Sequence, residues 1–295
     1  MENSQLLESF ALRCRLKNLT PASEKNYVER LSYLIRFAAS KGRTLGQLTR
    51  MDLQEYVAGL IGKVSGETVN GRIRCYRVLF RHLHDEGLID GNPMERISLV
   101  RPEKRVKPVL SIEDVRKILA GFNIRTFAGS RNRCLFLLLY DSMLRLDEGL
   151  SLKIADINLK DGLVKVTQGK GRKDRIVPAS DQTIQAIHSY LIRYRKGAPP
   201  NDILLPGPTG EKLQRRRGHR IVSQAATKVG LKAHPHLLRH SGASAFIRAG
   251  GSVSILQRIL GHSSLVVTQR YVTLNTADVS ESFARFSPMT GVIIN

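Results

Sequence analysis

Apolar residues in the first third of the chain recur every three or four positions, the spacing of amphipathic helices. Residues 4–16 show this pattern first, and a second stretch covers residues 20–42, where a glycine provides a stop signal. A threonine that can cap a helix opens a third stretch over residues 49–60, and a fourth covers residues 68–85. The pattern therefore predicts a small bundle of four helices.

The periodic pattern stops at Ile97, where the segment "ISLVRPEKRVKPVLS" contains two prolines and a cluster of basic residues. Such a segment predicts a linker. Ser111 followed by Asp114 resembles a capping signal, and it predicts that a new helix opens there. We therefore divide the chain into a helical domain over residues 1–96, a basic linker over 97–110 and a second domain over 111–295.

The second domain has a mixed pattern. The stretch "RNRCLFLLLYDSML" predicts a buried helix, and the period then changes to that of strands over residues 153–178, which favours a hairpin or a small three-stranded sheet. The fold class is thus mainly α with a small β-sheet. Further helices are expected at about residues 181–195, 212–229, 236–249, 253–260 and, in the tail, 276–286.

Composition limits the class of protein. The chain has 295 residues with 42% apolar content, and no uninterrupted apolar run approaches the length of a membrane span. Its first residues, "MENSQLLESF", lack the basic start of a secretory signal. Three scattered cysteines, Cys14, Cys75 and Cys134, suit reduced thiols and form no metal-binding motif. These features predict a cytoplasmic protein without a metal site.

The formal net charge of +22 is larger than solubility requires, and it indicates a polyanionic partner. The charge is uneven, because residues 1–96 hold 15 Lys and Arg against 11 Asp and Glu, whereas residues 97–295 hold 32 against 14. A basic amphipathic membrane helix would concentrate its charge in one segment. Here the charge is spread over many segments, which favours nucleic acid.

Four short stretches hold side chains that can grip or attack a phosphate. Taken singly, each has an ordinary interpretation: an arginine paired with Glu148, a solvated hairpin tip, a polar helix face, and a tyrosine packed against the core. The stretches are "SMLRLDEGLSL" with Arg145, "QGKGRKDR" with Lys170, "HPHLLRHSGAS" with His236 and Arg239, and "LGHSSLVVTQRYV" with His262 and Tyr271.

Taken together, their order and spacing resemble the tyrosine recombinase, or phage integrase, family over nearly the whole chain. That family has "TGLRxSEL"-like, "GKGxKxR", "HxLRH" and "LGH" motifs, followed by a tyrosine nine residues after the last histidine, where Tyr271 stands. The opening from Thr20 to Phe37 is similar to the family's helical core-binding domain. The first motif departs from the pattern, because Met143 and Gly149 replace the usual Gly and Leu.

The resemblance implies phosphoryl transfer on DNA without metal, nucleotide or other cofactor. A phenol with a pKa of about 10 is a poor nucleophile at neutral pH, so it needs a base and nearby positive charge. By this resemblance Tyr271 attacks the phosphorus and forms a 3′-phosphotyrosyl bond, and His236 accepts its proton. Lys170 protonates the departing 5′ oxygen. The phosphate is held by three donors, Arg145, Arg239 and His262.

The resemblance also implies a two-domain clamp around double-stranded DNA that carries a specific recombination site. Family members act as tetramers on two duplexes, and residues 276–295 are the candidate tail that docks on a neighbouring copy. We expect phosphate contacts, which position a protein without reading sequence, from two basic regions and the hairpin. These residues are Arg101, Lys104, Arg105, Lys107, Arg172, Lys173, Arg215, Arg216, Arg217 and Arg220.

Two other functions stay open at this point. A type IB topoisomerase shares much of this active-site chemistry but acts as a monomer, and the compact length, the "LGH" segment and the tail favour a recombinase. A catalytically inactive DNA-binding relative would need no nucleophile. The apparent lack of an additional N-terminal arm-binding domain favours a simple Xer-like or transposon-encoded enzyme over a large phage integrase.

Overall fold

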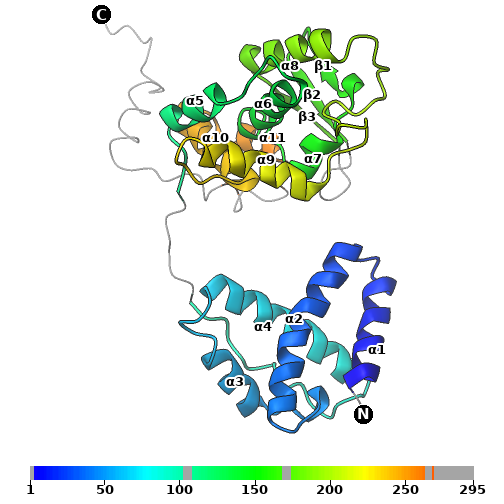
Figure 1. The fold of residues 1–295 in the computed structure, drawn as a ribbon. Helices are drawn as coiled ribbons and strands as arrows, with labels where there is room; N and C mark the ends of the chain where they lie inside the picture. Colours follow the sequence, from blue (N-terminus) through cyan, green and yellow to red (C-terminus); the bar gives the residue numbers. More distant parts are fainter. Residues whose placement is uncertain (1–2, 102–107, 168–173, 263–267, 269–295) are drawn as a thin grey trace, which may run out of the picture. The chain divides into compact units, whose positions relative to one another are not determined.

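The protein is described here by a computed structural model that covers residues 3–101, 108–167, 174–262 and Thr268 (Figure 1). The chain divides into two compact units, Met1–Val106 and Lys107–Asn295, which we call the N-terminal and C-terminal units. The helix predicted at residues 276–286 lies outside the described residues.

The N-terminal unit contains the four predicted helices, joined by short turns (Figure 1). Thr20 caps the second helix by accepting a hydrogen bond from the backbone of Ser23, and Pro21 occupies its first position, where the absence of an N–H costs nothing. The elements are α1 (Asn3–Leu16), α2 (Pro21–Ser40), the 3-10 turn η1 (Leu45–Gln47), α3 (Arg50–Ala58) and α4 (Gly66–Asp85).

The core of this unit is formed by the apolar faces of all four helices, α1 to α4, with Tyr76 of α4 fully buried. The Tyr76 hydroxyl lies 3.1 Å from the hydroxyl of Tyr56 and donates to the Arg30 carbonyl at 3.1 Å, so its burial leaves no polar group unmatched. Beyond α4 the chain stays attached to it. Asn70 exchanges two hydrogen bonds of 2.8 Å with the backbone of Val100, although our sequence division places that residue in the linker.

The C-terminal unit is mixed. Among its described residues, three strands form one antiparallel sheet in the order β1-β2-β3, with Val164 paired to Val177, which confirms the predicted small sheet. The helices are α5 (Ile112–Ala120), α6 (Phe127–Tyr140), α7 (Leu146–Ser151), α8 (Asp181–Tyr194), α9 (Arg215–Thr227), α10 (Pro235–Arg248) and α11 (Val253–Leu260); a 3-10 turn η2 (Ile154–Asp156) precedes β1 (Ile157–Asn158), β2 (Leu163–Val166) and β3 (Arg175–Pro178).

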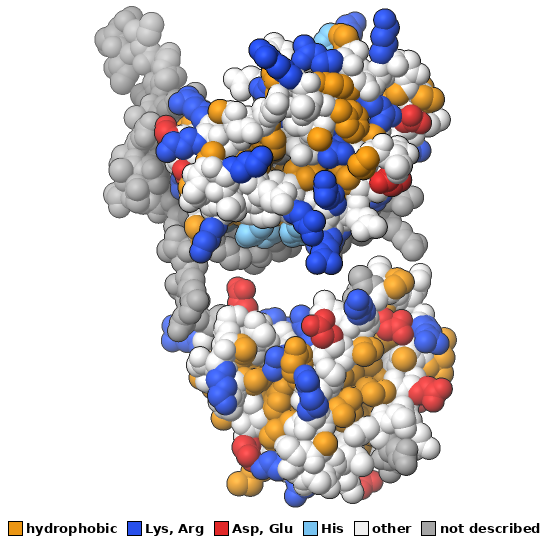
Figure 2. Space-filling model, in the orientation of Figure 1, with side chains coloured by type: hydrophobic (Ala, Val, Ile, Leu, Met, Phe, Trp, Pro, Cys, Tyr) orange, Lys and Arg blue, Asp and Glu red, His pale blue; other side chains and the backbone are white. Residues whose placement is uncertain are grey.

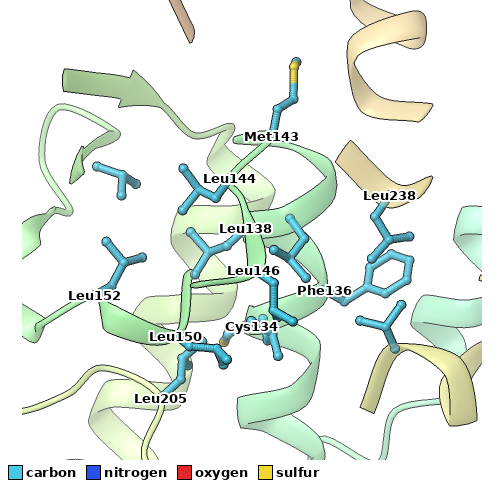
Figure 3. Close-up of a cluster of buried hydrophobic side chains, with 14 of the residues drawn as sticks. Cys134, Phe136, Leu138, Met143, Leu144, Leu146, Leu150, Leu152, Leu205 and Leu238 are labelled. Atoms are coloured by element: carbon cyan, nitrogen blue, oxygen red, sulfur yellow. The ribbon is translucent and has the colours of Figure 1, made fainter. Parts of the chain in front are cut away.

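Helix α6 is the centre of this unit and packs against α7, α8 and α10. Its side chains Cys134, Phe136 and Leu138 join residues of α7 and α10 in one buried cluster (Figure 3). The helix begins four residues before the predicted start, because Thr126 caps it by accepting from the Gly129 backbone at 3.1 Å.

Two further boundaries differ from the prediction. The sequence pattern gave no bounds for the six-residue helix α7, since so short a segment shows no periodicity. Helix α9 begins at Arg215 rather than at 212, because Lys212 forms an antiparallel bridge with Pro206 and Leu213 is buried in the core.

Helices α10 and α6 approach each other very closely where Gly242 faces the last turn of α6. A Cβ atom at Gly242 would lie 1.9 Å from the carbonyl oxygen of Tyr140, whereas real Cβ contacts are essentially never shorter than 3.0 Å. Only glycine allows this approach. It holds α10, which carries two of the predicted site residues, directly against the segment that leads into α7.

Candidate active site

The turn between α6 and α7 positions Arg145. Met143 adopts φ = 53° there, in the left-handed region that glycine occupies more readily than any other residue. A methionine therefore adopts a backbone conformation here that glycine would adopt without strain. The carbonyl of Met143 accepts a hydrogen bond of 2.7 Å from Nη1 of Arg239, so the turn is tied to α10.

Glu148 is the charged centre of the site. Its carboxylate accepts the backbone N–H of Arg145 at 2.8 Å, which caps α7, and it accepts Nη1 of the same arginine at 2.9 Å. It also accepts Nη1 and Nη2 of Arg175 at 2.9 and 2.8 Å, a two-point bond between a planar guanidinium and a carboxylate. Its side chain is 7% exposed, whereas that of Arg145 is 29% exposed and reaches solvent.

The environment of Glu148 keeps this carboxylate ionised. Burial, the largest single influence, raises its pKa, but the hydrogen bonds and charges of Arg175 and Arg145 together outweigh burial and lower the pKa to about 2. The site therefore contains a permanent negative charge that is matched by more than one arginine.

Arg239 lies on α10 and is 3% exposed. Besides its bond to Met143, its Nη2 donates to the Leu260 carbonyl at 2.7 Å, and its Nη1 lies 3.8 Å from the Glu148 carboxylate. These contacts fix the guanidinium between the turn before α7 and the end of α11. Such a fixed, desolvated cation is suited to hold an anionic group.

His262 follows α11, which ends at Gly261 with φ = 62°. The ring is held from two sides: Nδ1 lies 3.0 Å from the hydroxyl of Thr268, and Nε2 lies 3.5 Å from Nη2 of Arg239. The backbone carbonyl of His262 accepts from the Gln257 side chain at 3.1 Å. The imidazole is thus oriented with its Nε2 atom beside the buried arginine.

His236 is exposed on the first turn of α10, one turn before Arg239. The helix start is held by His234, whose Nδ1 accepts the backbone N–H of Leu237 at 3.1 Å, and by Pro235 at the first helical position. Desolvation first, and then the charge of His219, lowers the pKa of His234. The neutral form that this cap requires is therefore favoured.

The structure brings Arg145, Arg239 and His262 together, and it places His236 on the same helix as Arg239. Arg101 is exposed, and so are the four arginines predicted on α9, which include Arg215 paired with Asp147 at 2.7 Å. The other predicted residues, Lys104, Arg105, Lys107, Lys170, Arg172, Lys173 and Tyr271, lie outside the described residues.

Sequence reasoning missed the part played by Arg175, and it considered Glu148 only as a surface partner of Arg145. Asp147, the residue before it, is exposed, whereas Glu148 is buried. The available signal was the last residue of "GKGRKDR", which is Arg175, the first residue of β3.

The surface of the C-terminal unit is basic. On the face drawn in Figure 2, Lys and Arg side chains are spread over this unit and outnumber Asp and Glu. Within the described ranges, no group of three or more His, Cys, Asp and Glu side chains is arranged to hold a metal ion. No helix in the described part of the chain is both long and apolar enough to cross a membrane.

Comparisons with known proteins agree with this geometry. Residues 108–278 match the phage integrase family, and residues 6–90 match the phage integrase N-terminal SAM-like domain. The chain is 31% identical over 234 residues to the tyrosine recombinase XerC of Thermodesulfovibrio yellowstonii, covering 77% of each protein. It is 30% identical to XerA of Pyrococcus furiosus, covering 98% of this chain and 96% of that protein.

Among solved structures, the XerH site-specific recombinase bound to its palindromic difH substrate has a similar fold. The TM-score is 0.75 at 23% identity, with 96% of this chain and 84% of that chain covered. The arrangement of helices around a small antiparallel sheet is therefore shared with a DNA-bound recombinase.

Proposed function

Because the chain belongs to the phage integrase family, and is a site-specific tyrosine recombinase that cleaves and rejoins DNA, we propose that Tyr271 is its nucleophile. In the same proposal, Arg145, Arg239 and His262 hold the scissile phosphate. The observation that supports it best is the convergence of these three donors, although Arg145 and Arg239 are more than 90 residues apart in sequence. Arg239 lies 3.5 Å from His262 and is bonded to the turn that precedes Arg145.

The chemistry requires this kind of site. As the phenolic oxygen of Tyr271 bonds to phosphorus, negative charge grows on the nonbridging oxygens, and fixed guanidinium donors stabilise it without reorganisation. The bond from phosphorus to the 5′ oxygen breaks, Lys170 gives that oxygen a proton, and His236 takes the proton of the phenol. The 3′-phosphotyrosyl bond replaces one phosphodiester with another, so a 5′ hydroxyl of a second strand can reverse the step.

The partner is double-stranded DNA that carries a specific recombination site. Exposed arginines of α9 and Arg101 contact its phosphates, and the two domains enclose the duplex. Strand exchange between two duplexes requires four cleavages, and each protomer offers one nucleophile. The active assembly is therefore a homotetramer on two sites, with residues 276–295 docking on a neighbour. We also propose that the protein acts on DNA in the cytoplasm.

A strand-exchange assay tests this function. Binding sites are first selected from a library of random duplexes, and the wild-type protein is then mixed with two labelled duplexes of the selected sequence. Recombinant products from the wild type, and none from Tyr271→Phe, are expected. Relaxation of a supercoiled plasmid without recombinant products would favour a topoisomerase. Tight binding with neither activity would identify a DNA-binding relative.

A further inference from the structure

We propose that Arg175 is a positioning residue that keeps Glu148 neutralised, so that the charges of Arg145 and Arg239 remain available to the scissile phosphate. The inference rests on the proposed function of Arg145, Arg239 and His262, which hold the scissile phosphate and which we call the phosphate clamp. It concerns a residue of β3 that is outside the set of residues proposed to contact DNA.

The geometry shows why a separate counter-charge is needed. Glu148 lies 2.9 Å from Nη1 of Arg145 and 3.8 Å from Nη1 of Arg239, so its negative charge faces both clamp arginines. A buried carboxylate paired with these two alone would offset one of their positive charges and compete with the phosphate for it. Arg175 instead engages both carboxylate oxygens, at 2.8 and 2.9 Å.

Arg175 is itself fixed from a third direction. Its Nε donates to the carbonyl of Ile259 at 2.9 Å, in the last turn of α11, two residues before Gly261. A Cβ atom at Gly261 would lie only 3.1 Å from Cδ of Arg175 and 3.2 Å from its Nε. The glycine thus serves two purposes, since it allows the left-handed turn into His262 and leaves room for the arginine.

These contacts make Arg175 a brace between three elements: β3, where it stands, α7 through Glu148, and α11 through Ile259. Its side chain is 12% exposed, so the bonds form in a largely water-free setting where hydrogen-bonded charge pairs are strongly oriented. These bonds keep the position and charge of Glu148 constant when the phosphate replaces water at Arg145 and Arg239.

The test compares two nicked duplexes of the selected site, one with an ordinary scissile phosphate and one with an uncharged methylphosphonate at the same position. Covalent cleavage rates are measured for the full-length wild type, Arg175→Met and Arg175→Met/Glu148→Gln. Methionine keeps the unbranched apolar stem of the side chain and removes the guanidinium with its charge. Glutamine keeps the oxygen that caps α7 and removes the competing negative charge.

The expected result is a loss of cleavage rate that is larger on the charged phosphate than on the uncharged methylphosphonate. Arg175→Met should slow cleavage of the ordinary phosphate by about 100-fold, the size found when one preorganised donor is lost, and slow the methylphosphonate by less than about 10-fold. Adding Glu148→Gln should restore at least about 10-fold on the ordinary phosphate. Equal losses on both substrates with no recovery in the double variant would overturn the proposal.

A matched control separates this role from general destabilisation. Arg195 is 11% exposed, like Arg175, and pairs with the more exposed carboxylate of Asp202 at 3.1 Å. Within the described ranges, no hydrogen bond or ion pair joins Arg195 to the site. Arg195→Met should change the two rates by the same factor. If Arg175→Met does not fold, Arg175→Lys keeps the positive charge and should lose less than 10-fold on the ordinary phosphate; a larger loss, equal on both substrates, would count against the proposal.

A failure of the proposed role of Arg175 can be distinguished from a failure of the proposed function. If the wild type forms no covalent product with the ordinary duplex, the proposed chemistry is wrong. If the wild type cleaves, Tyr271→Phe does not, and Arg175→Met cleaves both substrates at wild-type rates, only the role of Arg175 is wrong.

Discussion

Replacing Gly242 with alanine probes the closest approach between helices in the C-terminal unit. The new Cβ atom would lie 1.9 Å from the Tyr140 carbonyl oxygen and 3.4 Å from Cγ of Met143. Reaching the shortest tolerated contact of 3.0 Å requires α10 and α6 to separate by roughly 1 Å. In an open helix, alanine would be favoured over glycine by about 1 kcal/mol.

Overpacking of a well-filled core costs about 1–3 kcal/mol, and a backbone carbonyl cannot turn aside as a side chain does. We therefore expect Gly242→Ala to lower the free energy of unfolding by about 2 kcal/mol, in spite of the better helix propensity. Arg239 stands three residues away, and its 2.7 Å bonds to Met143 and Leu260 tolerate little displacement. A shift of roughly 1 Å should therefore slow DNA cleavage by about 100-fold.

Urea denaturation of the full chain measures the stability, and covalent cleavage of a nicked duplex measures the activity. Gly149→Ala is the matched control, because its Cβ would meet Leu135 at an ordinary 3.5 Å and it lies inside α7. That variant should gain about 0.5–1 kcal/mol. If Gly242→Ala proved as stable as the wild type, or as active, the close approach of α10 and α6 would not be a real feature of the folded protein.

Three further predictions concern the cap at His234, the turn at Met143 and the exposed arginines of α9. The lowered pKa of His234 means that its contribution to stability is complete above the unfolded value of about 6.5 and is lost as pH falls through the folded pKa. His234→Asn provides a cap that does not titrate. In this variant the free energy of unfolding, measured by urea denaturation at several pH values, should fall less at acidic pH than in the wild type. Met143→Gly should lower the free energy of unfolding by about 1–2 kcal/mol, because the packing of a buried methionine side chain contributes more than the roughly 1 kcal/mol of left-handed strain that glycine relieves. A variant more stable than the wild type in the same assay would contradict this. Affinity for duplex DNA should fall steeply between about 50 and 200 mM salt, and Arg216→Gln or Arg220→Gln should each reduce the slope of log affinity against log salt by about 1; an unchanged slope would remove that residue from the DNA contacts.

The helices and the sheet could be predicted because their signals are local. Thr49 and Ser111 are capping residues in the structure, as the sequence predicted. Helix α7 could not be predicted in this way. It is six residues long, and Glu148 holds its first turn by accepting the Arg145 backbone N–H.

The site could be predicted only in part. Arg145, Arg239 and His262 were identified from motif order, and the structure adds what places them: the left-handed turn at Met143 and the contact at Gly242. These features depend on atoms more than 90 residues apart in sequence, such as the Tyr140 carbonyl facing α10. A local sequence pattern cannot predict such a contact. The buried pair of Glu148 and Arg175 could therefore be identified only from the folded structure.

The most direct test of the account is a covalent trap. A duplex of the selected site, nicked beside the scissile phosphate so that the short fragment diffuses away, is incubated with the protein in EDTA and separated on a denaturing gel. The account predicts a slowly migrating protein–DNA band for the wild type, none for Tyr271→Phe, and a linkage that maps by mass spectrometry to Tyr271. A band that persists in Tyr271→Phe, or no wild-type band on a duplex that the protein demonstrably binds, would contradict it.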